Sequence, residues 1–159
     1  EKGLMQGKFE RPKKWIIDGF MSQRILFMAL PMAIGTLYLF RGYFEVDIVK
    51  AWTISLTTLA AFQWFNAWNC RSESESIFKM NPFSNKFLVG ATVIVIFLQF
   101  VALYTPFLQK ILHVTSLSLS EWLMIIPIAF SIVLVEEIRK FFYRRKINKL
   151  YSKIQQKNI

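Results

Sequence analysis

Four long apolar segments, separated by short polar stretches, constrain this chain more than any other feature of its sequence. The chain is 54% hydrophobic and contains 16 Phe among its 159 residues, which is too apolar for an ordinary soluble domain of this size. About 20 apolar residues in a helix cross a bilayer, and a helix satisfies its own backbone hydrogen bonds in lipid. The sequence therefore predicts an all-α membrane protein.

The four predicted spans are consecutive along the chain, at about residues 20–40, 51–70, 87–104 and 121–142. Because the connections are short, neighbouring helices should run antiparallel, which predicts a four-helix antiparallel bundle. The fourth span should continue as a long basic helix, since apolar residues still recur at helical spacing among the basic ones. The predicted regions are an N-terminal segment at 1–24, a transmembrane domain at 25–142 and a basic tail at 143–159.

The charged residues predict how the chain crosses the membrane. The net charge is +10, and residues 1–24 carry six basic against three acidic side chains. Residues 136–159 carry eight basic against two acidic ones, whereas the loops after the first and third spans are close to neutral. Basic residues accumulate on the cytoplasmic side, so we expect both termini there. We expect a multi-pass protein of the cell membrane. We expect the tail to meet anionic lipids, and no nucleic acid as a partner.

Three amide side chains follow one another at the end of the second span: Gln63, Asn66 and Asn69. Residues three apart lie on one slowly drifting face of a helix, and lipid offers an amide no hydrogen-bond partner. We therefore expect Gln63 to face the bundle, with Asn66 on the adjoining turn and Asn69 in helix packing. An amide oxygen is a ligand that calcium accepts, but it serves equally well in an interhelical hydrogen bond, so both roles stay open for Gln63.

Small residues in the first span predict a close helix contact. Ala29 and Ala33 are one turn apart, and Gly35 follows them. Such spacing lets two helix backbones approach closely, although small residues are also common in spans that make no such contact.

Known active-site patterns are missing from the sequence. There is no phosphate-binding loop, no nucleophile elbow and no Ser, His and Asp set. One Cys and one His leave no basis for a zinc site. Glu136 and Glu137 at the end of the fourth span are expected to pair with Arg139 and Lys140, and a role in transport is the alternative. We therefore expect no catalytic residue and no resident cofactor in this chain.

One stretch carries a specific resemblance. Residues 51–73, and above all Phe-Asn-Ala-x-Asn-Cys-Arg-Ser-Glu at 65–73, resemble the eighth transmembrane helix and following loop of P-type cation-transporting ATPases, in the calcium-pump branch. Further similar segments lie at Arg11-Pro12, 104–109, 117–122 and 137–141. The resemblance covers essentially the whole chain and implies helices seven to ten of such a pump.

The resemblance also implies roles for single residues. Gln63 matches an ion-site position where some relatives carry Glu, which makes it the candidate ligand of the transported metal ion. Asn66 is the second ion-binding candidate. Asn66 matches a position that is acidic in sodium pumps. Ala29 and Ala33 fall where relatives pack the seventh helix against the fifth.

The implied function is that of a membrane domain within an ATP-driven pump, with calcium as the expected cargo. The domain would brace the transport helices and supply one ion-facing helix, and its partners would be the remaining helices and cytoplasmic domains of the pump. The parent would use ATP and Mg²⁺ at sites outside this chain, so only the parent would be the translocase. The alternative is a freestanding four-span protein that binds or regulates a partner. Because the chain begins with Glu1 and not Met, we expect a piece of a longer protein.

Overall fold

The computed structural model describes residues 19–72 and 75–157, with side chains from 22 to 72 and from 75 to 145. Every regular element in these ranges is helical: α1 (Gly19–Phe44), α2 (Ile48–Asn69), η1 (Pro82–Ser84), α3 (Lys86–Tyr104), α4 (Pro106–Leu112) and α5 (Leu119–Lys157). The predicted all-α class is confirmed for this part of the chain. The N-terminal segment up to residue 18 and the side chains of the basic tail from residue 146 lie outside the described residues.

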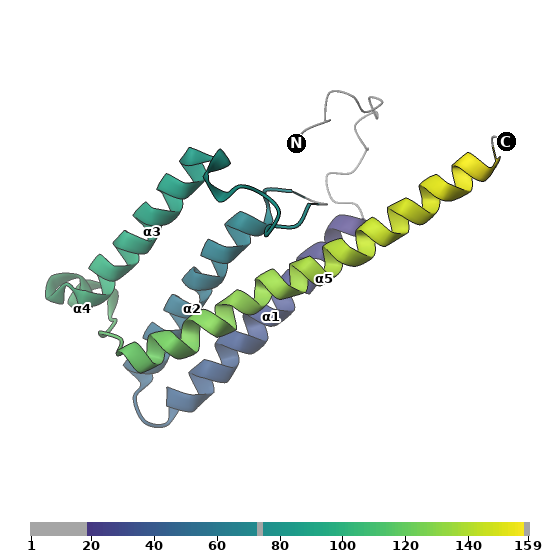
Figure 1. Ribbon diagram of the computed structural model, residues 1–159. Coiled ribbons are helices and arrows are strands. Elements are labelled where there is room, and N and C mark those ends of the chain that lie inside the picture. The colour runs from purple at the N-terminus through teal and green to yellow at the C-terminus, as the bar shows by residue number, and fades with distance from the viewer. Residues whose placement is uncertain (1–18, 73–74, 158–159) are drawn as a thin grey trace.

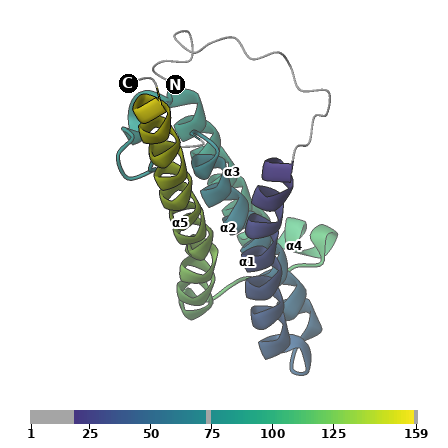
Figure 2. The same cartoon turned by 90° about the vertical axis from the view of Figure 1, so that its right-hand side faces the viewer.

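The central helix is α2, which contacts α1, α3 and α5. In Figure 1 it runs between α3 on one side and the pair α1 and α5 on the other, whereas in the turned view of Figure 2 α1 and α5 stand on opposite sides with α2 and α3 between them. Small buried residues such as Ala51 and Ala61 let its neighbours come close. The buried hydroxyls of Thr53 and Thr58 bond back to the carbonyls of Val49 and Ile54, at 2.8 and 2.6 Å, which satisfies them within the helix.

Three helices are long and apolar enough to cross a membrane, at Ser22–Phe44, Lys86–Tyr104 and Leu119–Arg145. They correspond to three of the four predicted spans. The predicted span at 51–70 corresponds to α2, which has 22 residues but does not meet the same criterion of apolarity. Its threonines and amides lower its hydropathy, and several of them, including Thr53, Thr57 and Asn69, are fully buried against other helices. Much of the polarity of α2 therefore lies on the side that packs against the other helices.

At Gly35, α1 lies close to two other helices. A Cβ atom at this position would lie 2.7 Å from Cγ2 of Ile128 in α5 and 3.1 Å from Cζ of Phe62 in α2. Ala29 and Ala33, by contrast, are exposed. The described helices of this chain therefore pack on Gly35, and the contact predicted for Ala29 and Ala33 is not made with any of them.

The connection between α3 and α5 is more ordered than the sequence predicts. A loop is expected over residues 105–120, but α4 forms within it, beginning at Pro106, where a missing N–H costs nothing. His113 ends this helix in the left-handed conformation, with φ of 52°.

The start of α5 is fixed by a reciprocal cap. The backbone N–H of Ser118 donates to Oε2 of Glu121 at 2.6 Å, and the N–H of Glu121 donates to Oγ of Ser118 at 3.4 Å. Ser118 and Glu121 are three residues apart in the sequence, which is the spacing of a capping box, and the two bonds form that box. From here α5 continues for 39 residues, and its C-terminal half projects beyond the other helices (Figure 1).

Candidate functional site

The three amides of α2 lie in three different environments. Gln63 is exposed, Asn66 is half-buried and Asn69 is fully buried. The prediction that Gln63 faces the bundle of this chain is wrong. Three residues turn a helix by about 300°, so the stripe drifts by about 120° from Gln63 to Asn69. That rotation carries Asn69 into the core and leaves Gln63 outside it.

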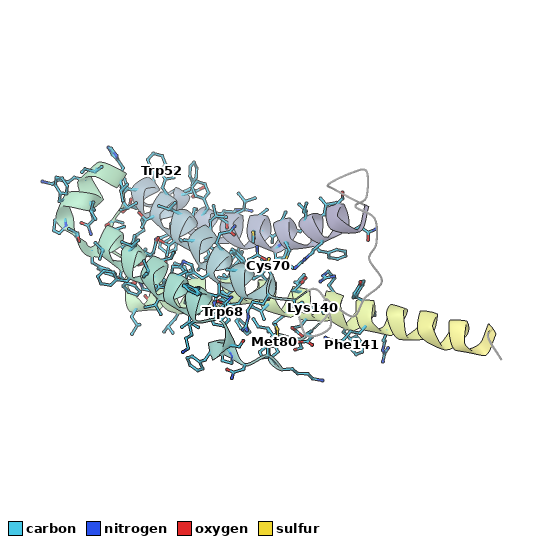
Figure 3. All side chains as sticks on the ribbon, turned by 90° about the horizontal axis from the view of Figure 1, so that it is seen from above. Trp52, Trp68, Cys70, Met80, Lys140 and Phe141 are labelled. Atoms are coloured by element: carbon cyan, nitrogen blue, oxygen red, sulfur yellow. The ribbon has the colours of Figure 1, made fainter. Side chains whose placement is uncertain are left out.

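One face of α2 remains uncovered along the whole helix. Its exposed residues recur three or four positions apart: Trp52, Leu56, Leu59, Gln63, Ala67 and Cys70. Figure 3 labels Trp52 and Cys70 near opposite ends of this row. Gln63 is a strongly polar member of an otherwise largely apolar surface, and within the described part of the chain its amide makes no hydrogen bond. A membrane helix with such a face needs a polar partner from elsewhere.

Asn69, the last residue of α2, is bound to α5 at two points. Its Nδ2 donates to the carbonyl of Ile132 at 3.3 Å, and its own carbonyl accepts from Nζ of Lys140 at 3.2 Å. Lys140 is fully buried, so this is an unusual place for an ammonium group. A cation at the carbonyl end of a helix is favoured by the helix dipole.

A buried carboxylate lies one turn before Lys140. Glu136 accepts two hydrogen bonds from Arg139, at 2.7 and 2.8 Å, and forms an ion pair of 3.2 Å with Arg24 of α1. The predicted pairing of Glu136 with Arg139 is confirmed. Sequence reasoning missed Arg24 and the burial of Lys140, because both depend on α1, α2 and α5 meeting at this end of the molecule.

The loop between α2 and α3 is held across the same end. Oε1 of Glu137 accepts from the backbone N–H of Ile77 at 2.8 Å. Within the loop, Nη2 of Arg71 donates to the carbonyl of Asn81 at 3.0 Å and to Oγ of Ser84 at 2.6 Å. These bonds connect the polar loop that follows α2 both to α5 and to the segment just before α3.

Gln63 on the uncovered face of α2 and the half-buried Asn66 beside it are too few ligands for a complete calcium site. Calcium takes six to eight oxygen ligands, and here Gln63 and Asn66 offer two neutral amide groups. Over the described residues no group of three or more His, Cys, Asp or Glu side chains is placed to hold a metal ion. The arrangement can therefore add neutral oxygen ligands to a site that other groups complete.

Comparison with known proteins gives one family and several relatives. The family described as "Cation transporting ATPase, C-terminus" matches residues 1–142. The chain is 37% identical over 110 residues to "Calcium-transporting ATPase 4, endoplasmic reticulum-type" of Arabidopsis thaliana, which covers 69% of this chain and 10% of the relative. It is 37% identical over 106 residues to the "Calcium-transporting ATPase" of Plasmodium falciparum, covering 67% and 9% of the two chains. With "Calcium-transporting ATPase 1" of Saccharomyces cerevisiae the identity is 32% over 134 residues, covering 82% and 14%. The chain thus spans only about a tenth of the length of these relatives.

Proposed function

The chain belongs to the family of cation-transporting ATPase C-terminal regions, as the resemblance predicted, and from this premise we propose that it is the membrane-embedded C-terminal domain of an ATP-driven calcium pump. The observation that carries the proposal is the family match over residues 1–142. Calcium as the cargo is supported by the names of the relatives. The uncovered face of α2 fits the same proposal, because a domain of a larger membrane protein must present a surface to the rest.

In this proposal α2 is a fourth membrane span, and the four helices form an antiparallel bundle. Only residues 45–47 separate α1 from α2, so the chain must turn back at once and run alongside α1. Both termini then lie on the cytoplasmic side, where α5 extends as a basic helix against anionic lipid. The charge distribution of the sequence supports this orientation.

The domain has two tasks in the proposed pump. It braces the transport helices through α1, where the exposed Ala29 and Ala33 offer a surface for close packing with a helix from outside this chain. It also presents α2 to the transported cation, with the oxygens of Gln63 and Asn66 as its ligands there. ATP and Mg²⁺ bind to other domains of the pump, and those domains and the remaining membrane helices are the partners of this chain.

The freestanding membrane protein is the competing function, and two measurements separate it from the pump. The coding sequence upstream of Glu1 should continue in frame and include Asp-Lys-Thr-Gly-Thr, the phosphorylation motif that the family resemblance implies. Membrane vesicles containing the complete protein should then take up radioactive calcium when ATP is added, and removal of residues 1–159 should abolish uptake. A stop codon directly upstream, or uptake that survives the truncation, would contradict the proposal.

The membrane that holds the protein is part of the same proposal. The charge pattern predicts which side of a membrane the termini face and does not distinguish one membrane from another. The sequence-based expectation is the cell membrane, while the name of the Arabidopsis relative contains the words "endoplasmic reticulum-type". We propose a multi-pass protein whose complete, fluorescently tagged form coincides with a cell-membrane marker. Coincidence with an endoplasmic-reticulum marker would contradict the assignment to the cell membrane and leave the membrane topology untouched.

A further inference from the structure

A buried polar cluster fixes the end of the helix that carries the candidate cation ligands. We call it the anchor cluster: Arg24 of α1, Asn69 of α2, and Glu136, Arg139 and Lys140 of α5. Figure 3 labels Lys140 near Cys70, the residue after Asn69, in agreement with the bond from Lys140 to the carbonyl of Asn69. Three helices therefore meet through hydrogen bonds and ion pairs at the point where α2 ends.

The stability of the fold alone does not explain why this cluster is polar. Removing an ammonium or a carboxylate from water costs several kcal/mol per ion, and well-packed hydrophobic residues in the same place are often at least as stable. The side chains of Glu136 and Lys140 are nevertheless fully buried. Hydrogen bonds depend on the relative orientation of the two helices, whereas apolar contacts depend on it much less. The bonds from Asn69 to the carbonyl of Ile132 and from Lys140 to the carbonyl of Asn69 fix the rotation and height of α2 relative to α5.

The rotation of α2 at Asn69 determines where Gln63 points. Six residues separate them, or about 9 Å along a helix, over which α2 behaves as a rigid rod. A rotation of about 20° would move a side-chain atom near the helix surface by about 2 Å. Calcium–oxygen distances fall in a range of only about 2.3–2.6 Å, so a shift of that size would remove an amide oxygen from a cation site.

We propose that Lys140 and Asn69 are positioning residues for cation binding, which hold α2 at the rotation that presents Gln63 and Asn66 to the cargo. The proposal rests on the pump function proposed above. Neither residue is a ligand in it: Asn69 is buried six residues from Gln63, and Lys140 carries a positive charge.

The test uses the complete pump and the single variants Lys140→Met and Lys140→Arg. The readouts are the Ca²⁺ concentration and the ATP concentration that give half-maximal phosphorylation. Residues that act through a coupling network change affinity by roughly two- to thirtyfold. We expect Lys140→Met to weaken Ca²⁺ affinity by an amount in that range with ATP affinity unchanged, and Lys140→Arg to restore most of the loss. The matched control is Lys79→Met, which removes the same charge from an exposed position in the loop between α2 and α3.

Two further variants keep the proposal testable if Lys140→Met does not reach the membrane. Asn69→Ala removes the bond to Ile132 and keeps the carbonyl that accepts from Lys140, and it should weaken Ca²⁺ affinity by a smaller factor. The double variant Gln63→Ala with Asn69→Ala should lose less Ca²⁺ affinity than the two single losses added together, because both substitutions act on the ligand from Gln63 and only the effect on Asn66 is separate.

Different results would overturn the ion role of Gln63 and the positioning role of Lys140 and Asn69. If Gln63→Ala weakens Ca²⁺ affinity while Lys140→Met and Asn69→Ala leave it intact, the positioning role is overturned and the ion role of Gln63 survives. If Gln63→Ala has no effect, both roles are overturned and the family assignment still stands. Equal losses of Ca²⁺ and ATP affinity in Lys140→Met, or loss of thermal stability alone, would also overturn the positioning role.

Discussion

A single glycine decides how closely α1 can approach its two neighbours. We predict that Gly35→Ala destabilises the chain, because the added Cβ would lie 2.7 Å from Ile128 and 3.1 Å from Phe62. Forced overpacking of this kind costs about 1–3 kcal/mol. Gly42→Ala is the control in the same helix, since a Cβ there meets no atom within 4 Å. Thermal unfolding in detergent should show a lower midpoint for Gly35→Ala only, and equal midpoints for the two variants would contradict the packing.

At the residue scale, the sequence predicted interactions between residues that are only a few positions apart in the chain. The Ser118–Glu121 cap and the Glu136–Arg139 pair both join residues three apart, so helix geometry alone brings them together. The burial of Lys140 could not be predicted in this way. Its partner Asn69 is 71 residues earlier in the chain, and a basic residue near the end of a membrane helix is ordinarily in contact with water.

The orientation of Gln63 was mispredicted for a different reason. The argument that a membrane amide avoids lipid is sound, but it assumes that all of its partners belong to this chain. The exposed position of Gln63 indicates a surface that this chain alone does not cover. The same reasoning applies to Ala29 and Ala33, whose predicted packing also remains without a described partner.

At the scale of whole elements, α3 is joined to α2 by few specific bonds. Nε2 of Gln99 donates to Oγ1 of Thr57 at 3.2 Å, and Nε1 of Trp68 donates to Oγ1 of Thr92 at 3.0 Å. Gln99, a polar residue in an otherwise apolar helix, thus has a hydrogen-bond partner on the neighbouring helix. An apolar cavity of about 570 Å³, lined by aromatic side chains that include Trp64 and Phe100, lies between α2, α3 and α5. The two polar bonds therefore hold α3 in place where apolar packing is incomplete.

We predict a measurable coupling between Thr57 and Gln99. Interhelical hydrogen bonds in membranes are worth about 0.6 kcal/mol on average, so a double-mutant cycle of Thr57→Val and Gln99→Leu should give a coupling energy of that order. The control cycle pairs Gln99→Leu with Thr92→Val, seven residues away in the same helix, and should be additive. The same coupling in both cycles would show that the bond does not join the helices.

The helix that the sequence described least well is α2. Both ends of α2 can be predicted from the sequence. It begins after Asp47, whose side chain accepts from the N–H of Lys50 at 3.0 Å, and it ends at Asn69, where the polar loop begins. The central position of α2 among the helices could not be predicted from hydropathy. A hydropathy scale counts Thr as polar, although the hydroxyls of Thr53 and Thr58 are satisfied by carbonyls of their own helix.

At the scale of the whole molecule, the proposed topology places the two ends of α2 on opposite sides of the membrane. We predict that Cys at Val46, just before α2, is labelled by an impermeant thiol reagent from outside the cell. Cys at Phe83, in η1 before α3, should react only after the membrane is opened. Both positions are exposed, and both variants are made with Cys70→Ser so that the native thiol does not react. Labelling of both positions from outside would show that α2 does not cross.

The proposal that this chain is a pump domain depends on the surface of α2 that the chain leaves uncovered. The most direct measurement is the Ca²⁺ concentration for half-maximal phosphorylation of the complete pump carrying Gln63→Ala. Loss of a group that supports a metal commonly weakens affinity by about tenfold or more. We predict a change of that size with unchanged ATP affinity. Leu59→Ala, one turn away on the same exposed face and without a ligand oxygen, should leave Ca²⁺ affinity unaltered. Equal Ca²⁺ affinities in Gln63→Ala and Leu59→Ala would contradict the claim that α2 faces the transported ion.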